Sequence, residues 1–335
     1  MNRLAVRAAL LLAVVAFLVC VALYWRWVVR PLPLTAALDV EILPGESLHV
    51  AADKFQAQGI LPDAREFVLY ARLRRSTGAV RAGEYRVEPG TSLAGLLDLL
   101  CSGKVVMHSL TLAEGLTVKQ WLALVESDPS LTHSLKGLGL RAVMQRIGGG
   151  DMSPEGYLMP DTYQFPRGLS DVAFLRRARE AAVQELARAW QSRAPDLPYK
   201  SPYDALIMAS IVEKETGQPT ERGEIAGVFV RRLQKGMKLQ SDPTVIYGLG
   251  DAYDGDITLK DLRTDSPYNS YTRYGLPPTP ICNPGRAALQ AALHPTPGNS
   301  LYFVARGDGT HQFSANLVEQ NAAVQKYQLH KPTPP

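Results

Sequence analysis

The sequence predicts an α+β protein with an N-terminal transmembrane helix, a small α+β module and a larger domain of mixed helices and strands. Three observations support this fold class. An apolar run without charge occupies residues 8–25, short β-type runs alternate with amphipathic helices from about 39 to 126, and long helical patterns followed by a hairpin pattern fill the second half. The chain has 335 residues, 46% of them hydrophobic, which is enough for two domains with real cores.

The N-terminal apolar run is long enough to cross a membrane. Ala8–Trp25 contains 18 residues without a charge, and arginines flank it on both sides. Such a run predicts a transmembrane helix over residues 8–27, with aromatic side chains at its far interface. A cleaved signal peptide is the alternative, although the run exceeds a usual signal core. The flanking arginines are balanced, so they do not fix the orientation. Residues 28–38 are expected to form a linker, in which Arg30–Leu34 is a short stiff spacer.

Residues 39–126 contain an irregular repeat of a strand, a glycine turn and an amphipathic helix. The turns of the three units lie at residues 43–48, 88–93 and 113–118, and the expected helix N-caps are Ser47, Ser92 and Thr117. The uneven spacing favours a small α+β module over a solenoid. This strand–helix–helix–strand pattern resembles LysM-type glycan-binding modules, and a spacer domain without a ligand is the alternative.

Charge and cysteine content exclude several classes of protein. The formal net charge is only +4, and the densest basic stretches are residues 72–75 and 176–177, which are typical of solvated helix faces. We therefore expect no nucleic-acid partner. The cysteines are Cys20, Cys101 and Cys282, too few and too scattered for a disulfide framework or a metal site. No metal or cofactor is expected, and a Cys101–Cys282 bridge is left open.

Residues 127–198 are expected to form a connecting region that packs on the domain after it. Residues 132–150 predict a helix and a loop, and Met159–Pro166 is an aromatic, proline-bounded loop or edge strand. Strong helical spacing over residues 171–191 predicts a core-facing helix.

The best-signalled helix of the chain lies between Ser201 and Gly217. Ser201 can cap the first N–H groups, Pro202 suits the first helical position, and Asp204 completes a capping box. Gly217 lies where a left-handed residue would end the helix. We therefore predict about four turns from Pro202 to Thr216.

Glu215 lies on the apolar face of this predicted helix. The residues three, four and seven positions before it are Val212, Ile211 and Met208. Desolvation and the negative end of the helix dipole both raise the pKa of a carboxyl in this position. Such a group can act as a general acid in glycosidic cleavage. The alternative is that Glu213 and Glu215 are ordinary solvated residues at a helix end.

Residues 199–329 make up the predicted catalytic domain, and 330–335 a tail. After the central helix, residues 220–235 predict a second helix that stops at Gly236. Asp242 before Pro243 is a plausible cap of a short helix, and Thr258–Asp261 reads as a capping box. Stiff polar and aromatic loops follow in two segments, and loops of this kind suit sugar rings, although a structural role is the default for any one residue.

The last third of the domain has clearer patterns. A helix capped by residues 283–285 should run to Leu293, residues 301–305 and 310–313 read as a β-hairpin, and a final helix should extend to about Leu329. His294 and His311 stand alone in the sequence, so each is interpreted as a structural hydrogen-bonding residue.

Five segments together resemble one family, the membrane-anchored endolytic murein transglycosylases of the YceG-like (MltG) type. They are ASIVEKET from Ala209, LQSDPTVIYG from Leu239, SPYNSYTRYGLPPTPI from Ser266, AALHP from Ala291 and LYFVA from Leu301. The resemblance covers most of the chain, including the anchor and the module. One departure is Ser270, where the family pattern leads us to expect threonine.

The resemblance implies both a reaction and a catalytic residue. The catalytic acid of that family is the second glutamate of the EKE triplet, which is Glu215 here, and not Glu213. The implied reaction is non-hydrolytic cleavage of the β-1,4 bond between N-acetylmuramic acid and N-acetylglucosamine within nascent strands, which leaves 1,6-anhydromuramyl ends and limits strand length. We expect five residues to hold glycan and to orient the acid: Gln240, Asp242, Tyr268, Asn269 and Tyr271.

The resemblance also implies a location and partners. A single-pass protein of the bacterial cytoplasmic membrane is expected, with residues 1–7 as a cytoplasmic tail and the C-terminal domain outside the cytoplasm. Its partners would be peptidoglycan strands and, by proximity, the penicillin-binding proteins that synthesise them.

Two rival functions remain open from the sequence. The first is an inverting peptidoglycan hydrolase in which Glu215 is the acid and Asp242 the base on a water molecule. The second is a membrane-tethered glycan-binding scaffold whose enzyme-like fold is inert.

Overall fold

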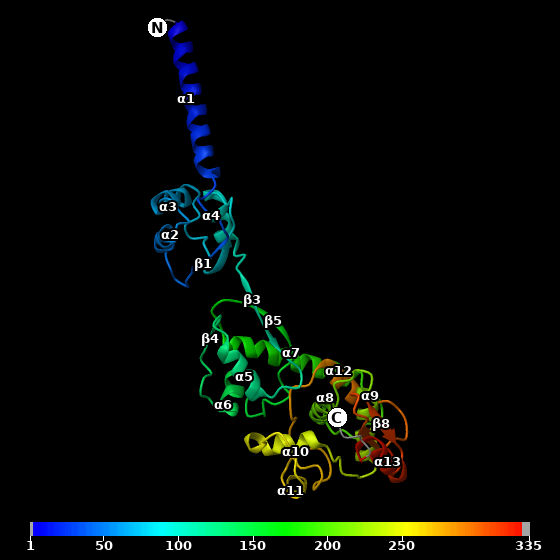
Figure 1. Cartoon of the computed structure of the whole chain (residues 1–335). Coiled ribbons are helices and arrows are strands. Elements are labelled where there is room, and N and C mark those ends of the chain that lie inside the picture. The colour runs from blue at the N-terminus through cyan, green and yellow to red at the C-terminus, as the bar shows by residue number, and fades with distance from the viewer. Residues whose placement is uncertain (1–2, 330–335) are drawn as a thin grey trace, which may run out of the picture. The chain divides into compact units, whose positions relative to one another are not determined.

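A computed structural model describes residues 3–329 of the chain, and it confirms a mixed α+β protein with an apolar N-terminal helix. The chain divides into two compact units (Figure 1). The first comprises residues 1–108 with 164–168, and the second comprises residues 109–163 with the chain from 169 onward. Each unit is described separately below.

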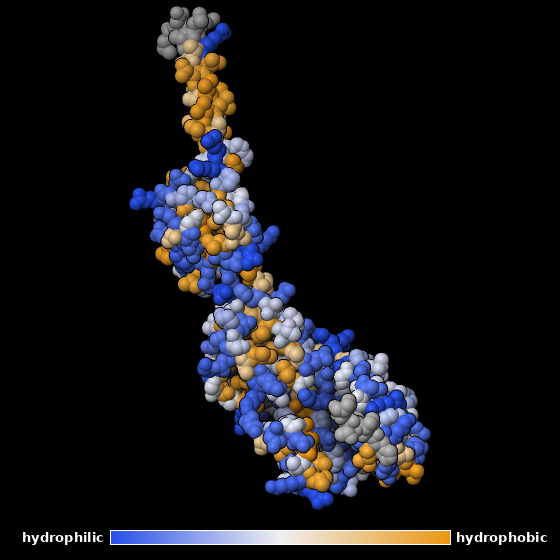
Figure 2. Space-filling model, in the orientation of Figure 1, coloured by the Kyte–Doolittle hydropathy of each residue, from blue (hydrophilic) through white to orange (hydrophobic). Residues whose placement is uncertain are grey.

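The first unit begins with α1 (Arg3–Val29), the one described helix that is long and apolar enough to span a membrane. Its apolar part, Val6–Val29, has 24 residues with a mean hydropathy of 2.8 and none of its most apolar stretch is buried. Figure 2 shows apolar side chains along the visible face of this helix. Length and composition therefore agree with the predicted transmembrane helix.

The chain that follows α1, predicted as a short stiff spacer, packs against the folded unit. Val28 and Leu32 are both buried in the core of the unit. The backbone N–H of Leu32 donates to the carbonyl of Thr91 at 2.8 Å, and Trp27 Nε1 donates to Glu66 at 3.0 Å. These contacts attach the end of α1 directly to the module.

The module itself contains the expected strand–helix–helix–strand order followed by another helix. Its elements are β1 (Leu38–Ile42), α2 (Leu48–Ala57), α3 (Ala64–Leu73), β2 (Gly83–Val87) and α4 (Leu93–Ser102). β1 and β2 are antiparallel neighbours. Ser47 and Ser92 accept hydrogen bonds from N–H groups in the first turns of α2 and α4, as their positions predicted. The unit closes at His108, and the third repeat lies in the second unit. A LysM-like identity stays a prediction.

The second unit opens with a small mixed region. It contains α5 (Val118–Ser127), β4 (Leu131–Thr132), α6 (Leu140–Arg146), β6 (Leu169–Ser170) and α7 (Asp171–Gln191), together with part of β3 (Met107–Leu112) and of β5 (Asp161–Pro166), whose other residues belong to the first unit. β3 pairs with β5, so the edge-strand interpretation of residues 159–166 is confirmed. β4 and β6 form a short parallel pair. Thr117 caps α5 through a full capping box with Gln120.

A helical cluster with a terminal hairpin follows. Its elements are α8 (Pro202–Glu215), α9 (Arg222–Gln234), α10 (Asp242–Leu249), a 3₁₀ turn (Gly250–Ala252), α11 (Leu259–Arg263), α12 (Arg286–Leu293), β7 (Tyr302–Ala305), β8 (His311–Ser314), α13 (Leu317–Val324) and a π-helical turn (Gln325–Leu329). α8 contacts α7, α9, α10 and α12, and its residues 205–212 are all buried. The antiparallel β7–β8 hairpin confirms the predicted one. α8 is therefore the centre of this core (Figure 1).

The ends of α8 differ in detail from the prediction. Ser201 is the N-cap residue, but its side chain accepts no hydrogen bond from the first helical N–H groups. The Asp204 carboxylate instead accepts the N–H of Lys200 at 2.7 Å. Gly217 is not left-handed, so its predicted role as the αL terminator is wrong. The helix ends because Thr216 adopts an extended backbone directly after Glu215. As a result, Glu215 is the last helical residue.

All three cysteines are free thiols, so the bridge left open by the sequence is not formed. Cys101 belongs to the first unit and Cys282 to the core of the second. Cys282 is fully buried, and its Sγ donates to the carbonyl of Ser210 on α8. Cys282 therefore packs against α8 in the interior of the second unit.

Candidate active site

A cavity of about 520 Å³ opens at the C-terminal end of α8. Its volume is in the range of small-molecule binding sites. The central helix contributes Glu215 to the wall, α9 contributes one arginine, and the β7–β8 hairpin with α13 forms the facing wall. The lining residues are Glu215, Arg232, Leu239, Gln240, Asp242, Tyr271, Tyr302–Ala305, His311, Leu317, Gln320, Val324 and Gln328.

Glu215 combines a largely apolar setting with access to this cavity. Val212, Ile211 and Met208 are completely buried on its face of α8, as the sequence predicted. Burial raises the pKa of Glu215 to about 7, and the nearby charge of Asp242 adds to the rise. A hydrogen bond from Ser241 and the charge of Arg232 act in the opposite direction. The carboxyl can therefore give up and regain a proton near neutral pH.

Ser241 holds the Glu215 carboxyl through a short hydrogen bond. Its Oγ donates to Glu215 Oε1 at 2.5 Å. The backbone N–H of Ser241 donates to Ser270 Oγ at 2.9 Å, and Ser270 Oγ also lies 2.8 Å from the hydroxyl of Thr244. All three residues are buried. Ser270, the position where threonine was expected, thus fixes the backbone that carries the donor to the acid.

Asp242 is the first residue of α10, and Ser241 occupies the cap position. The interpretation of Asp242 as the helix cap is therefore wrong. Its Oδ1 instead accepts a hydrogen bond from the Tyr271 hydroxyl at 2.6 Å. Burial and the Asp242 carboxylate raise the pKa of that tyrosine, so its hydroxyl keeps its proton. Both side chains line the cavity beside Glu215.

Gln240 lines the same cavity from a left-handed backbone conformation, with φ of +53°. A non-glycine residue seldom adopts this conformation unless its surroundings hold it there. Its N–H donates to the carbonyl of Ser270 at 3.1 Å, and its Oε1 accepts a 3.3 Å hydrogen bond from Arg232. The strained turn is therefore held from two sides.

Arg232 is a site residue that the sequence analysis missed. It is buried, and its guanidinium donates to the carbonyl of Leu301 at 2.7 Å and to that of Leu239 at 2.6 Å. It also stacks over the Tyr302 ring at 5.0 Å. It therefore joins the two walls of the cavity and brings a positive charge near Glu215. The available signal was its spacing, because Arg232 continues the buried stripe of Val228 and Phe229 on α9.

Tyr268 and Asn269 lie outside the lining of this cavity, unlike the other three residues expected to hold glycan. Asn269 is 1% exposed, and its amide donates to the carbonyls of Asp261, Leu262 and Thr264. The Tyr268 hydroxyl pairs with Thr279 at 2.9 Å, and its ring packs against Tyr247. Both residues stabilise the loop before α12.

Glu213 has a different environment from Glu215, although only one residue separates them. Its Oε2 accepts the N–H of Gly285 at 2.8 Å, and Arg222 lies 3.6 Å from its other oxygen. The neighbouring Lys214 donates to the carbonyl of Gly115 at 3.3 Å. These two residues therefore attach the turn before α5 and the start of α12 to the central helix.

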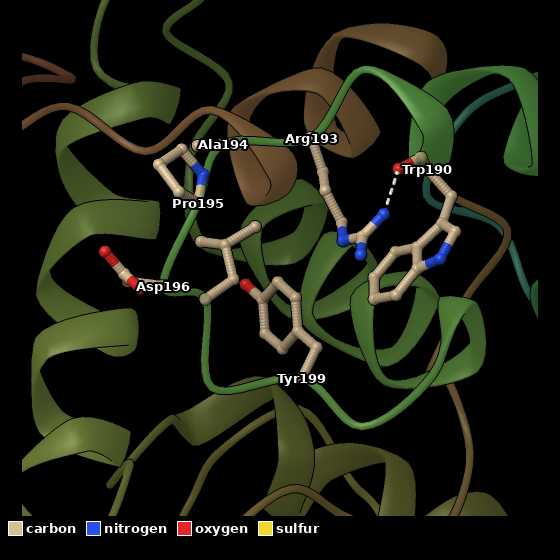
Figure 3. A pocket seen from close by; sticks show the side chains of 7 residues that line it. Trp190, Arg193, Ala194, Pro195, Asp196 and Tyr199 are labelled. Atoms are coloured by element: carbon tan, nitrogen blue, oxygen red, sulfur yellow. Dashed lines mark hydrogen bonds between the residues drawn. The ribbon is translucent and has the colours of Figure 1, made fainter.

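A second hollow, of about 380 Å³, lies after the end of α7 (Figure 3). The Arg193 guanidinium stacks over the Trp190 ring at 4.1 Å and donates to the Trp190 carbonyl, and Tyr199 forms part of the same wall. Its one carboxylate, Asp196, is exposed. This hollow offers no buried acid, so the chemistry of the unit is assigned to the Glu215 cavity.

Within residues 3–329, no group of three or more histidine, cysteine, aspartate or glutamate side chains is arranged to hold a metal ion.

Comparison with known proteins agrees with the architecture. The sequence profile of the YceG-like family matches residues 40–326. The chain belongs to the YceG-like family. A curated relative from Bacillus subtilis, named endolytic murein transglycosylase, is 30% identical over 307 residues, which cover 87% of this chain and 84% of the relative. The resemblance seen in the sequence motifs is therefore confirmed at the level of the family.

Two further comparisons extend this result. Relatives of the same name from two strains of Streptococcus pneumoniae are 26% identical over 318 residues, and the aligned region spans only 57% of their length. A crystal structure of a YceG-like protein from Listeria monocytogenes superposes with a TM-score of 0.52 at 29% identity, covering 86% of this chain and 99% of that one. The fold of this chain is therefore similar to that of a YceG-like protein of known structure.

Proposed function

We propose that this YceG-like protein is a lytic transglycosylase that cleaves the MurNAc-β-1,4-GlcNAc bond within nascent peptidoglycan strands. The observation that carries the proposal is Glu215, a carboxyl with a pKa of about 7 that lines a cavity of sugar-binding size at the end of the central helix. The names of the curated relatives support the same reaction. The products are strands with 1,6-anhydromuramyl ends, and such cleavage limits strand length.

In the first step Glu215 protonates the oxygen that links the two sugars. The C1–O bond of the muramyl residue breaks as positive charge develops at C1 and on the ring oxygen. Ser241 donates to the resulting carboxylate, and the positive charge of Arg232 stabilises it. The donor is therefore positioned for the charge that forms when the proton leaves.

In the second step the Glu215 carboxylate accepts the proton of the muramyl C6 hydroxyl, and O6 bonds to C1 of the same residue. The proton lost in the first step is thus restored, and no water is consumed. Attack within one sugar residue supplies a high effective concentration of the nucleophile. A second catalytic carboxylate is not needed, in contrast to an ordinary glycoside hydrolase.

We assign supporting roles to three of the predicted residues. Gln240, Asp242 and Tyr271 contact the glycan, because all three line the cavity with Glu215. Tyr268 and Asn269 act indirectly by holding the loop that carries Ser270 and Tyr271.

The inverting hydrolase remains the specific rival, because Asp242 lines the same cavity as Glu215. In that mechanism Asp242 would activate a water molecule. The two reactions leave different ends: a hydrolase produces reducing N-acetylmuramic acid, and a transglycosylase produces the anhydro form. The third possibility, an inert scaffold, predicts no new ends at all.

The decisive experiment is mass spectrometry of purified sacculi after digestion with the full-length protein in detergent. Anhydromuramyl ends from the wild type, and their loss in Glu215→Gln, would support the proposal. Reducing ends would favour the hydrolase. No new ends from the wild type would favour the inert scaffold, and equal release of fragments by Glu215→Gln and wild type would exclude Glu215 as the catalytic acid.

We propose that α1 anchors the protein in the bacterial cytoplasmic membrane as a single span, with the folded units outside the cytoplasm. The length and apolarity of Val6–Val29 support a membrane span. The orientation follows from the substrate, because peptidoglycan lies outside that membrane. Penicillin-binding proteins, which make the nascent strands, are the expected neighbours.

A further inference from the structure

The hairpin wall of the cavity carries a histidine that the proposed mechanism does not use. His311 is the first residue of β8, it lines the cavity, and its side chain is 14% exposed. Its isolation in the sequence indicated a structural hydrogen-bonding residue but did not indicate which partner it has. In the fold, Glu221 at the start of α9 binds it twice, since Oε1 accepts the His311 backbone N–H at 2.9 Å and Oε2 lies 2.7 Å from Nδ1.

This pairing favours one tautomer and one orientation of the imidazole ring. A carboxylate oxygen accepts hydrogen bonds, so this contact fits the tautomer with the hydrogen on Nδ1, and in that tautomer Nε2 can accept a hydrogen bond. The rings of Phe303 and Phe313 pack around the imidazole at 5.4 and 6.4 Å between centroids and limit its rotation. Nε2 has no hydrogen-bond partner within residues 3–329.

Gln320 on α13 presents a second acceptor on the same wall. Its Nε2 donates to the carbonyl of Phe303 at 3.1 Å, which fixes the orientation of the amide. Its Oε1 is buried and lacks a hydrogen-bond partner in the described part of the chain. A buried acceptor without a partner costs free energy, unless a ligand supplies the donor.

We infer that His311 and Gln320 form a sugar subsite on the hairpin side of the cavity, where Nε2 and Oε1 accept hydrogen bonds from glycan hydroxyl or acetamido N–H groups. This inference rests on the proposed function and names a second wall of the same substrate site. Glu221 is a positioning residue, because it acts only through the histidine. The aromatic side chains of Tyr302 and Phe303 on the same wall suit the C–H faces of a sugar ring.

A structural role for the Glu221–His311 pair predicts different behaviour from a ligand role, and two substitutions separate them. His311→Asn places an amide N–H near the position of Nδ1 and keeps a donor to Glu221, but it has no atom at Nε2. His311→Gln places its amide near Nε2 and gives up the Nδ1 contact. The backbone hydrogen bond to Glu221 survives in both variants. His294→Ala is the matched control, since His294 is exposed and lies outside the cavity lining.

The test measures binding of glycan strands freed of stem peptides by an amidase, using the full-length Glu215→Gln protein in detergent so that the ligand persists. We expect His311→Asn to fold with an unchanged thermal midpoint and to bind about tenfold more weakly, the loss typical of one hydrogen bond in a ligand site. His311→Gln should bind within about threefold of the parent, by the same reasoning. His294→Ala should bind as the parent does.

Binding by His311→Asn equal to that of the parent, or a parallel loss in His311→Gln, would overturn the subsite and leave a structural pair. A measurement on the unsubstituted imidazole removes the dependence on variant folding: addition of the strands should shift the Nε2 resonance of His311 and not that of His294. No shift at saturation would also refute the inference. Loss of binding in His311→Asn, together with full cleavage by Glu215→Gln, would keep the subsite and remove the proposed acid.

Discussion

Two glutamates of the second unit have similarly raised pKa values but opposite surroundings. Burial raises the pKa of both Glu215 and Glu155 to about 7. Glu155 is 2% exposed and accepts hydrogen bonds from the backbone N–H of Val118 at 3.0 Å and from the Tyr247 hydroxyl at 3.2 Å. Glu215 lines the cavity and receives its hydrogen bond from Ser241. A raised pKa alone therefore does not identify an active site, and access to a ligand-sized cavity distinguishes the two.

The largest difference between the two glutamates should be in catalysis. Glu215→Gln removes the proposed acid and base, and we expect activity on sacculi to fall by about 10³-fold or more. Glu155→Gln should retain activity within about threefold, because a group sealed from the cavity cannot reach the substrate. Anhydromuramyl ends counted by mass spectrometry check both values. Equal losses in the two variants would contradict the comparison.

The pH dependence of cleavage should follow Glu215 and not Glu155. The first step requires the protonated acid, whose pKa is about 7. Activity should therefore fall about tenfold per pH unit above that value as the acid loses its proton. Initial rates measured between pH 5 and pH 9 should show this same decline in the wild type and in Glu155→Gln. If the decline above pH 7 disappeared in Glu155→Gln, Glu155 and not Glu215 would set the pH dependence of cleavage.

Ser241→Ala should shift the decline in activity to a different pH without abolishing cleavage. The Ser241 hydroxyl stabilises the ionised form of Glu215, so its removal raises the pKa of the acid further. A shift of about one unit toward higher pH is expected for one hydrogen bond to a charged group. Rate measurements at each pH check the position of the decline. Thr244→Val is the control, because it removes a neighbouring hydroxyl that does not contact the carboxyl. An unchanged pH profile in Ser241→Ala would contradict the conclusion that Ser241 lowers the pKa of Glu215.

The smallest expected effect is on stability, and here the substitution with the expected effect is at Glu155, which has no proposed role in cleavage. The pKa of Glu155 is higher in the folded chain than its ordinary value of 4.5. The stability that Glu155 contributes to the folded state is therefore fully present below pH 4.5 and is lost as the pH rises through 7. Glu155→Gln cannot ionise, so relative to wild type it should gain about 2 kcal/mol in free energy of unfolding between pH 5 and pH 8.5.

Chemical denaturation at these two pH values measures that gain. The glutamine can still accept the N–H of Val118, so little loss is expected at pH 5. A difference between wild type and variant that stays constant with pH would show that Glu155 keeps one protonation state across this range.

Local signals in the sequence were sufficient for the elements that depend on local rules. The stripe before Glu215, the capping box of Thr258 and Asp261, and the glycine turn between β7 and β8 are all set by residues a few positions apart. Long-range contacts were out of reach. Ser241 meets Glu215 across 26 positions, and Arg232 meets the carbonyl of Leu301 across 69.

The errors have the same origin. Asp242 before Pro243 satisfies the local rule for a cap, but Tyr271 binds its carboxylate from a distant loop. Gly217 satisfies the rule for a left-handed terminator, but Thr216 leaves the helix first. In each case tertiary contacts outweighed a correct local preference.

The junction between α1 and the first unit limits how this protein can be trimmed. Val28 and Leu32 are core residues of the folded unit, and Trp27 Nε1 is hydrogen-bonded to Glu66. A soluble version that begins at Arg30 would remove Trp27 and Val28 and open a gap beside Tyr70, whose ring the tryptophan meets edge-on at 5.9 Å. In a bilayer the same junction would make a change in the tilt of the helix turn the folded unit with it.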